Sequence, residues 1–285
     1  MNVAAKKRFG PLLLIAPAAI LIGVFLVLPY LNIVVMSFRM PGQGTPYGPG
    51  FTLVNYGKFF SDIFYIQQVA NTLWIGFVTT LACLILGYPV AWQLARGNSA
   101  FRAMGYGLVL SPLLVGIVIR SYGWTILLGN NGLINRTLMG WGIIDGPLPL
   151  MYNALGIVIA LVHVFLPFMI LPIMSAIQGI DPSLEAAARS LGASKATAFR
   201  RITLPLSLPG IQAGSILVFV LSLSAYVTPS LIGGLRVKTM AVTVVDALID
   251  TFQWPFGSAL ALMLSVTGAI VVVVFGRLTV MKWKA

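Results

Sequence analysis

The chain has 285 residues, of which 59% are hydrophobic and only 8% are charged. A soluble domain of this size cannot bury so much apolar surface, so the main solvent of the folded chain must be lipid. The net charge of +12 would suit a nucleic-acid partner, but the basic residues lie in short clusters between apolar runs and therefore report membrane topology. We expect an all-α integral membrane protein whose surroundings are the lipid bilayer, with no nucleic-acid partner.

Six apolar runs are long enough to cross a hydrocarbon core of about 30 Å. The first, residues 11–38, is longer than the apolar core of a signal peptide, so an uncleaved span is the preferred interpretation. A loop rich in Gly and Pro follows at residues 39–66, with a short interfacial helix expected near residues 54–64. The other spans are expected at residues 69–95, 103–128, 152–177, 210–232 and 258–279. Residues 11–280 are interpreted as one transmembrane domain between tails at residues 1–10 and 281–285.

Basic residues between the spans predict the orientation of the chain. One side takes twelve of the eighteen Lys and Arg residues, namely Lys6, Lys7, Arg8, Arg96, Arg102, Arg189, Lys195, Arg200, Arg201, Arg277, Lys282 and Lys284. The other side takes Arg39, Lys58, Arg136, Arg236 and Lys238, and Arg120 lies within a span. Because cytoplasmic loops carry the excess of positive charge, both termini and the 181–211 segment are expected in the cytoplasm.

The 181–211 segment, DPSLEAAARSLGASKATAFRRITLPLSLPGI, interrupts the apolar sequence with charge. Asp181 can cap a helix that begins at Pro182, and Gly192 stands where a helix commonly ends with positive φ. Ser194 can cap a second helix, which we expect Pro205 to stop. We call this predicted helix–Gly–helix segment the elbow.

The elbow resembles the EAA loop of permease subunits in bacterial ABC importers, E-A-A-x3-G-x9-I-x-L-P. Counted from Gly192, the match takes in Ala187, Ala188, Ile202, Leu204 and Pro205. Ala186 stands where the motif has Glu, and the nearby acid, Glu185, is turned by about 100° around the helix. The alternative is an ordinary basic loop that is rich in Ala.

The resemblance implies a type I importer permease fold and an elbow that docks on a separate ATPase subunit. The sequence has no G-x-x-x-x-G-K-[ST] loop, so ATP and Mg²⁺ are expected in that partner, and this chain is expected to be no enzyme and to bind no cofactor.

Further stretches, among them LACLILGYPVAWQLA, IRSYGWTILLG, YVTPSLIGG and WPFG, resemble the spermidine/putrescine branch of these permeases. This resemblance implies a polyamine importer of the bacterial inner membrane. The expected partners are a second permease, two ATPase subunits and a periplasmic solute-binding protein. Related branches that import amino acid derivatives, opines, phosphonates or Fe(III) stay open as alternatives.

Several polar residues are candidates for the substrate path. Arg120, with Tyr122 and Trp124 close by in IVIRSYGW, is the one formal charge within a span, although it could instead snorkel to the outer interface. Tyr226 and Thr228 belong to a polar, Pro-containing end of the fifth span. Asp246 and Asp250 are four residues apart and would share one helix face, either toward an outer vestibule or as a solvated pair.

A histidine, four prolines and the positions of the acidic residues bear on other possible functions. His163 is interpreted as a hydrogen-bonded helix contact, and no metal site is expected because no second ligand lies at i+4. Pro112, Pro167, Pro172 and Pro229 are expected to interrupt helices. An ion-coupled secondary transporter would need acids at mid-membrane, whereas all six acids fall in loops or helix ends.

Overall fold

A computed structural model describes residues 15–42 and 45–281 of the chain. The expected N-terminal tail at residues 1–10 lies outside the described residues, as does the C-terminal tail from residue 282 onward. The described chain is almost entirely helical and divides into two compact units. Unit 1 contains the described residues up to Ile63 together with Thr243–Ser265, and unit 2 contains Phe64–Val242 together with the described residues from Val266.

Unit 1 begins with the first span, Ile15–Ser37, which includes a π-helical turn, η1 (Gly23–Val27), and α2 (Leu28–Ser37). A short antiparallel hairpin, β1 (Arg39–Met40) and β2 (Gly48–Phe51), leads to α3 (Val54–Ser61), which confirms a short helix within the expected residues 54–64. The buried side-chain amide of Asn55 donates to the carbonyl oxygens of Ser37 at 2.9 Å and Arg39 at 3.0 Å. This one residue therefore ties α3 to the end of α2 and to the hairpin.

The rest of unit 1 comes from the second half of the chain. A π-helical turn, η4 (Asp246–Asp250), ends at Thr251, and the first turns of α15 (Trp254–Met281) follow. Phe252, between them, has a φ of 52°. A non-Gly residue in this region costs conformational energy, so the turn before α15 must be held by its surroundings.

Unit 2 contains the long helices. They are α4 (Ile63–Arg96), α5 (Ser99–Leu110) with the 3-10 turn η2 (Ser111–Leu114), α6 (Ile117–Leu128), α7 (Leu133–Gly140), α8 (Ala154–Gln178), α12 (Leu208–Ser224), α13 (Val227–Gly233), the first half of α14 (Met240–Val245) and the later turns of α15. The elbow lies between α8 and α12 and consists of α9 (Pro182–Ser190), α10 (Lys195–Ala198), the π-turn η3 (Phe199–Thr203) and α11 (Leu204–Leu206).

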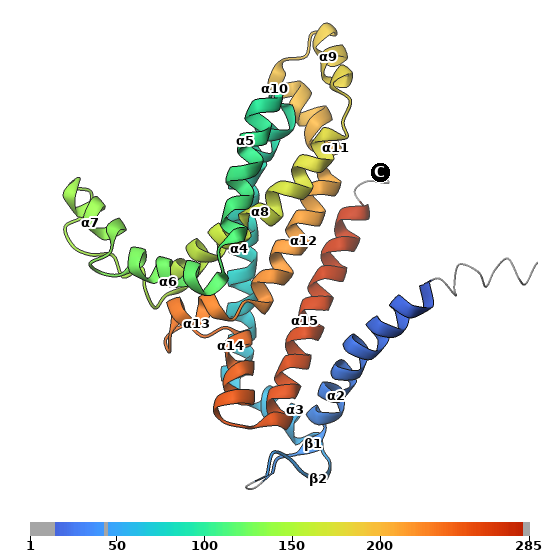
Figure 1. Cartoon of the computed structure of the whole chain (residues 1–285), viewed down its shortest axis with the longest axis vertical. Helices are drawn as coiled ribbons and strands as arrows, with labels where there is room; N and C mark the ends of the chain where they lie inside the picture. The colour runs from blue at the N-terminus through green and yellow to red at the C-terminus, as the bar shows by residue number, and fades with distance from the viewer. Residues whose placement is uncertain (1–14, 43–44, 282–285) are drawn as a thin grey trace, which may run out of the picture. The chain divides into compact units, whose positions relative to one another are not determined.

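The core of unit 2 is built around α8, which packs along α12 (Figure 1). Most of α8 is buried, including Ile157, Leu161, Met169 and Ile173, so this helix is apolar nearly all round. Two glycines of α12 bring the helices together. A Cβ built on Gly210 would lie 2.6 Å from the Pro172 carbonyl oxygen, and one built on Gly214 would lie 2.9 Å from the Met169 sulfur. Small residues at such positions are typical of helix pairs in membranes.

The expected spans agree with the structure in number but not in shape. Among the described residues, four helices are long and apolar enough to cross a membrane, or up to six if each of two bent pairs is one span. The expected third span, residues 103–128, is broken by 94° between Leu114 and Ile117. The expected fifth span, residues 210–232, is also not one helix, because α12 ends at Ser224 and the extended Ala225 separates it from α13.

The expectation that all four prolines interrupt helices is wrong for Pro167 and Pro172. Both lie inside the continuous helix α8, while Pro112 lies in η2 at the 94° break and Pro229 lies in the first turn of α13. Proline removes one backbone hydrogen bond, and a helix held on several sides by neighbours tolerates that loss. Pro112 lies at the break that precedes α6, and Pro229 follows the break between α12 and α13.

Candidate functional sites

The elbow is the helix–Gly–helix segment that its sequence predicts. The Asp181 carboxylate accepts from the Ser183 N–H at 2.8 Å at the start of α9, and the Ser194 hydroxyl accepts from the Thr197 N–H at 3.2 Å at the start of α10. Gly192 has a φ of +90°, so the predicted positive-φ turn is confirmed. Pro205 does not stop the second helix, because helical turns continue through α11 and the break comes at Ser207, after which Pro209 starts α12.

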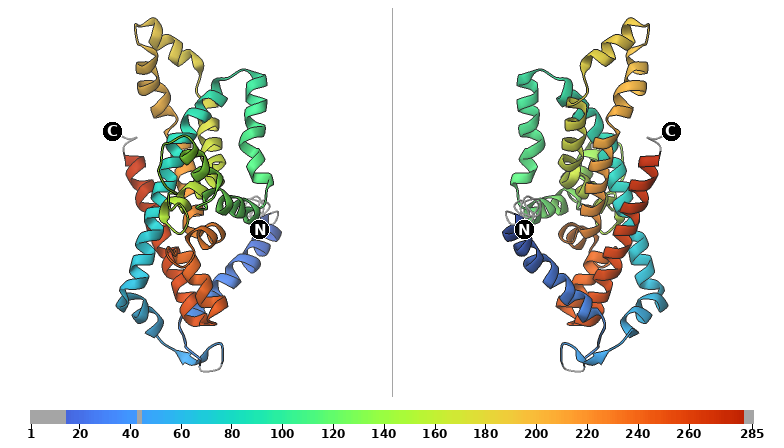
Figure 2. Two further views of the ribbon diagram at one scale, coloured as in Figure 1. Left: turned by 90° about the vertical axis from the view of Figure 1, so that its left-hand side faces the viewer. Right: turned by 90° about the vertical axis from the view of Figure 1, so that its right-hand side faces the viewer.

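The tip of the elbow exposes apolar surface. Figure 2 shows the elbow projecting beyond the ends of α4 and α5 at one end of unit 2. Leu191, at the turn, is 89% exposed, and Leu184 on α9 is 45% exposed. Of the motif residues, Ala187, Gly192 and Leu204 are exposed, whereas Ala188, Ile202 and Pro205 are half-buried. Exposed apolar side chains on a projecting turn are typical of a surface that binds another protein.

The Glu185 side chain contacts the base of the elbow and the end of α4 rather than the exposed tip. Its Oε1 accepts from Arg96 Nη2 at 3.1 Å and from the Thr203 hydroxyl at 2.8 Å. Arg96, the last residue of α4, also donates through Nη1 to the Ile180 carbonyl oxygen at 3.2 Å. We call these contacts of Arg96, Glu185, Thr203 and Ile180 the brace. The brace connects both elbow helices to the ends of α4 and α8.

Aromatic contacts lie next to the brace. The Tyr88 and Trp92 rings of α4 meet the Phe199 ring edge-on, with centroids 5.7 and 6.3 Å apart, and the Tyr88 and Ser207 hydroxyl oxygens are 3.0 Å apart. Between these groups is a pocket of about 520 Å³, lined by Tyr88, Pro89, Trp92, Glu185, Arg189, Lys195, Ala198 and Phe199. The elbow is therefore fixed to α4 by charge on one side and by aromatic packing on the other.

The candidate path residues of unit 2 fall into two groups. Thr228 of α13 is buried, and its hydroxyl oxygen lies 2.9 Å from that of the buried Ser121 of α6. Trp124 of α6 donates from Nε1 to His163 Nδ1 of α8 at 3.2 Å. Tyr122 and Tyr226 are exposed. The first pair joins α6 to α13, and the second joins α6 to α8.

Comparisons with known proteins place the chain in a family. Residues 11–280 match the family described as "Binding-protein-dependent transport system inner membrane component". The chain belongs to this family. It is therefore an inner-membrane transport permease, and its family is one of transport components rather than of enzymes.

Similar proteins have related descriptions. The permease is 35% identical over 253 residues to the spermidine/putrescine transport system permease protein PotB of Escherichia coli K12, covering 89% of this chain and 92% of that one. It is 34% identical to the Haemophilus influenzae protein of the same description, covering 89% and 88%. A solved bacterial alginate ABC transporter, in complex with an alginate-bound periplasmic protein, has the same fold, with a TM-score of 0.76 at 18% identity over 97% of this chain and 96% of that one.

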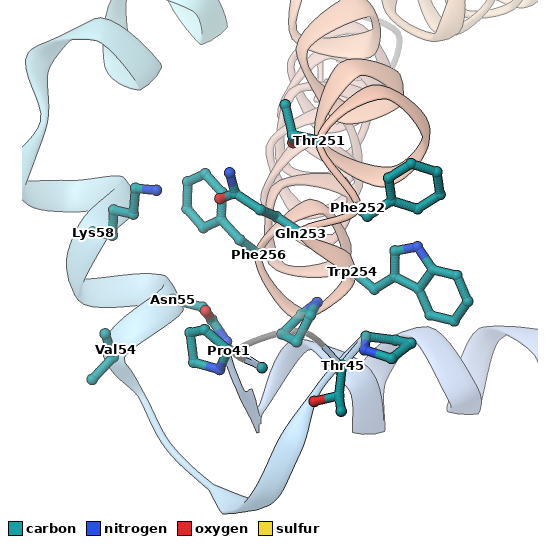
Figure 3. Close-up of a pocket in the computed structure, with 13 residues that line it drawn as sticks. Pro41, Thr45, Val54, Asn55, Lys58, Thr251, Phe252, Gln253, Trp254 and Phe256 are labelled. Carbon is teal, nitrogen blue, oxygen red and sulfur yellow. The ribbon is translucent and has the colours of Figure 1, made fainter.

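Asp246 and Asp250 belong to unit 1 of the permease, on η4, where Asp246 is half-buried and Asp250 is exposed. Directly after η4 a pocket of about 490 Å³ opens, lined by residues 251–256, by Asn55 and Lys58 of α3, and by the hairpin loop. Figure 3 shows Asn55 and Lys58 facing Gln253 and Phe256 across it. Lys58 Nζ lies 4.2 Å from the centroid of the Phe256 ring.

Several contacts at the candidate sites could not be predicted from the sequence. Arg96 counted only toward topology, and Thr203 and Ser121 were not singled out at all. His163 was interpreted as a hydrogen-bonded helix contact, and its bond to Trp124 confirms that interpretation. The signal for the brace was weak, because Arg96 and Glu185 are 89 residues apart in the sequence.

Proposed function

We propose that this permease forms the membrane path of an ATP-driven importer for polyamines of the spermidine/putrescine type. It works with a second permease, two ATPase subunits and a periplasmic solute-binding protein, and both of its termini lie in the cytoplasm. The identity to PotB proteins over 89% of the chain supports the substrate class. ATP and Mg²⁺ are bound by the ATPase subunits, and the permease itself carries out no hydrolysis.

The projecting elbow is the observation that carries this proposal. Leu191 and Gly192 form an exposed tip that fits a groove on an ATPase subunit, while Glu185 and Thr203 hold the base of the elbow to Arg96. Closure of the ATPase dimer on nucleotide then displaces the elbow as one piece. Because the brace also includes the Ile180 carbonyl beyond the end of α8, that displacement is passed to α8 and to α12 packed along it.

The loops of unit 1 receive the binding protein. The hairpin, α3 and the turn before α15 in unit 1 supply aromatic rings, two side-chain amides and Lys58 around an open pocket. Such a mixture of aromatic and polar groups is common where proteins bind one another. Arrival of the loaded binding protein and closure of the ATPase dimer would together drive alternating access of the path.

Reconstitution tests the proposal. The permease is co-expressed with a candidate second permease, ATPase and secreted binding protein from the same organism, and the complex is placed in proteoliposomes. We expect uptake of radiolabelled putrescine or spermidine. This uptake should require ATP on the side of the bilayer that carries the ATPase subunits and the binding protein on the other side. Uptake driven by an ion gradient without ATP would contradict the proposal and favour an ion-coupled transporter.

A further inference from the structure

Arg120, Trp124 and His163 form a small polar cluster in unit 2, at the broken third span. Trp124 Nε1 donates to His163 Nδ1 at 3.2 Å, and the two ring centroids are 5.5 Å apart. Arg120 lies one helical turn before Trp124, on the face of α6 that carries the contact with His163. The buried Ser121–Thr228 hydrogen bond connects the same turn of α6 to α13, so α13 restrains the helix that carries Arg120 and Trp124.

The groups of the cluster that are left free to bind a ligand are hydrogen-bond donors, with no free acceptor among them. Because Nδ1 of His163 accepts from Trp124, a neutral imidazole carries its proton on Nε2. His163 is exposed although it lies on the largely buried helix α8. Trp124 and Arg120 have only N–H groups to offer. The free groups of the cluster are thus a donor and a cation.

Arg120 has no acceptor in the described part of unit 2. Its Nε and Nη1 are buried without a hydrogen-bond partner. The acidic residues of unit 2 have other places: Glu185 binds Arg96, Asp181 caps α9, and Asp145 lies in the exposed segment after α7. A guanidinium at membrane depth needs a negative partner, and a carboxylate fits its geometry best.

We propose that Arg120 and His163 form a carboxylate-binding site in the membrane path. The inference rests on the proposed importer function and extends its substrate class beyond polyamines, because putrescine and spermidine carry only amines, which are donors and cations like the cluster itself. The carboxylate comes either from a substrate that bears an acid as well as an amine, or from the second permease subunit. Both sources present the same chemistry to the Arg120 guanidinium and to the N–H of the His163 imidazole.

The test uses the complete importer in nanodiscs, with Arg120→Gln, Arg120→Lys and the matched control Arg136→Gln, which changes an exposed arginine of α7. The first measurement is the retention of the second permease on gel filtration and the thermal midpoint of the complex without small molecules. If the carboxylate belongs to the second permease, Arg120→Gln lowers both, Arg120→Lys restores them in part because it keeps the charge, and Arg136→Gln changes neither.

The second measurement compares two probes of similar length, putrescine and 4-aminobutanoate, by the shift in thermal midpoint that each produces. If the carboxylate belongs to the substrate, 4-aminobutanoate stabilises the wild-type complex, and Arg120→Gln weakens its apparent affinity about 10-fold to 100-fold, the usual range for a charged hydrogen bond. His163→Leu weakens the same affinity by a smaller factor.

An Arg120→Gln complex that matches the wild type in both measurements would overturn the inference. So would Arg120→Lys being as damaging as Arg120→Gln in both, since that result would assign Arg120 a packing role. These outcomes are separate from the proposed function, whose failure would appear as a wild-type complex that takes up no polyamine with ATP.

Discussion

The brace predicts that Glu185 holds the elbow in place rather than touching the ATPase. Two substitutions separate its roles. Glu185→Gln keeps the size of the side chain and an oxygen for the Thr203 hydroxyl but removes the charge that faces Arg96. Glu185→Ala removes the charge and the acceptor together. We expect both variants to loosen the elbow, the alanine variant more strongly.

The magnitude follows from burial. The Arg96 and Glu185 side chains are 21% and 27% exposed, so the ion pair is only partly screened, and its loss in Glu185→Gln costs about 1 kcal/mol. Thr203 is fully buried, and stranding its hydroxyl in Glu185→Ala adds about 1–3 kcal/mol. The total of about 2–4 kcal/mol corresponds to roughly 30-fold to 700-fold more frequent local opening of the elbow.

Amide hydrogen exchange over residues 181–206 measures that opening in the complete importer, and ATPase activity with and without loaded binding protein measures coupling. We expect exchange in the elbow to rise in the order wild type, Glu185→Gln, Glu185→Ala, with stimulation of the ATPase falling in the same order. Arg189→Gln, at an exposed arginine of the same helix, serves as the control. An alanine variant with wild-type exchange and wild-type stimulation would refute the role assigned to the brace.

Three further predictions concern the same unit. Gly192→Asp should uncouple ATP hydrolysis from uptake, because a side chain at φ +90° strains the turn by about 1–3 kcal/mol and adds charge to the exposed tip; undiminished uptake at normal membrane levels would contradict this. Gly214→Val should lower the thermal midpoint and the yield of folded permease more than Gly23→Val does. A Cβ at position 214 would lie 2.9 Å from the Met169 sulfur, whereas no atom lies within 4 Å of a Cβ at position 23. Equal midpoints for the two variants would count against the tight α8–α12 packing. Acid should fray α9. Hydrogen bonds from the Ser183 N–H and hydroxyl lower the pKa of Asp181, so the cap that its carboxylate forms is present above the unfolded pKa and is lost as pH falls below about 4. Exchange of the α9 amides should show this loss in the wild type but not in Asp181→Asn.

The elbow could be predicted from sequence because its signals are local. Asp181, Pro182, Gly192 and Ser194 each report on backbone groups within three or four residues, and the structure places a cap or a turn at each of them. The orientation of Glu185 could not be predicted in this way. Its contacts depend on where α4 ends in space, and helical periodicity contains no information about Arg96.

The spans show the same difference between composition and geometry. Apolar runs gave the number of possible crossings, because burial in lipid needs only length and hydrophobicity. The 94° break after η2 and the separation of α12 from α13 depend on which backbone groups find partners within the folded unit. Proline was a poor guide for this reason: α8 contains Pro167 and Pro172 without a break, since its neighbours hold it on several sides.

Helix α8 connects the two sites that the structure brings out in unit 2. Its midpoint carries His163, which accepts from Trp124 beside Arg120, and the carbonyl of Ile180 just beyond its end accepts from Arg96 in the brace. Between these points α8 is continuous and packs against α12 at Gly210 and Gly214, where neither helix can move closer. A displacement of the elbow must therefore move α8 and α12 together, and the Trp124–His163 hydrogen bond is the first polar contact along α8 that such a movement would strain. In the proposed importer, coupling between ATP hydrolysis and the path is therefore a property of the α8–α12 pair, and the elbow is the point at which force enters it.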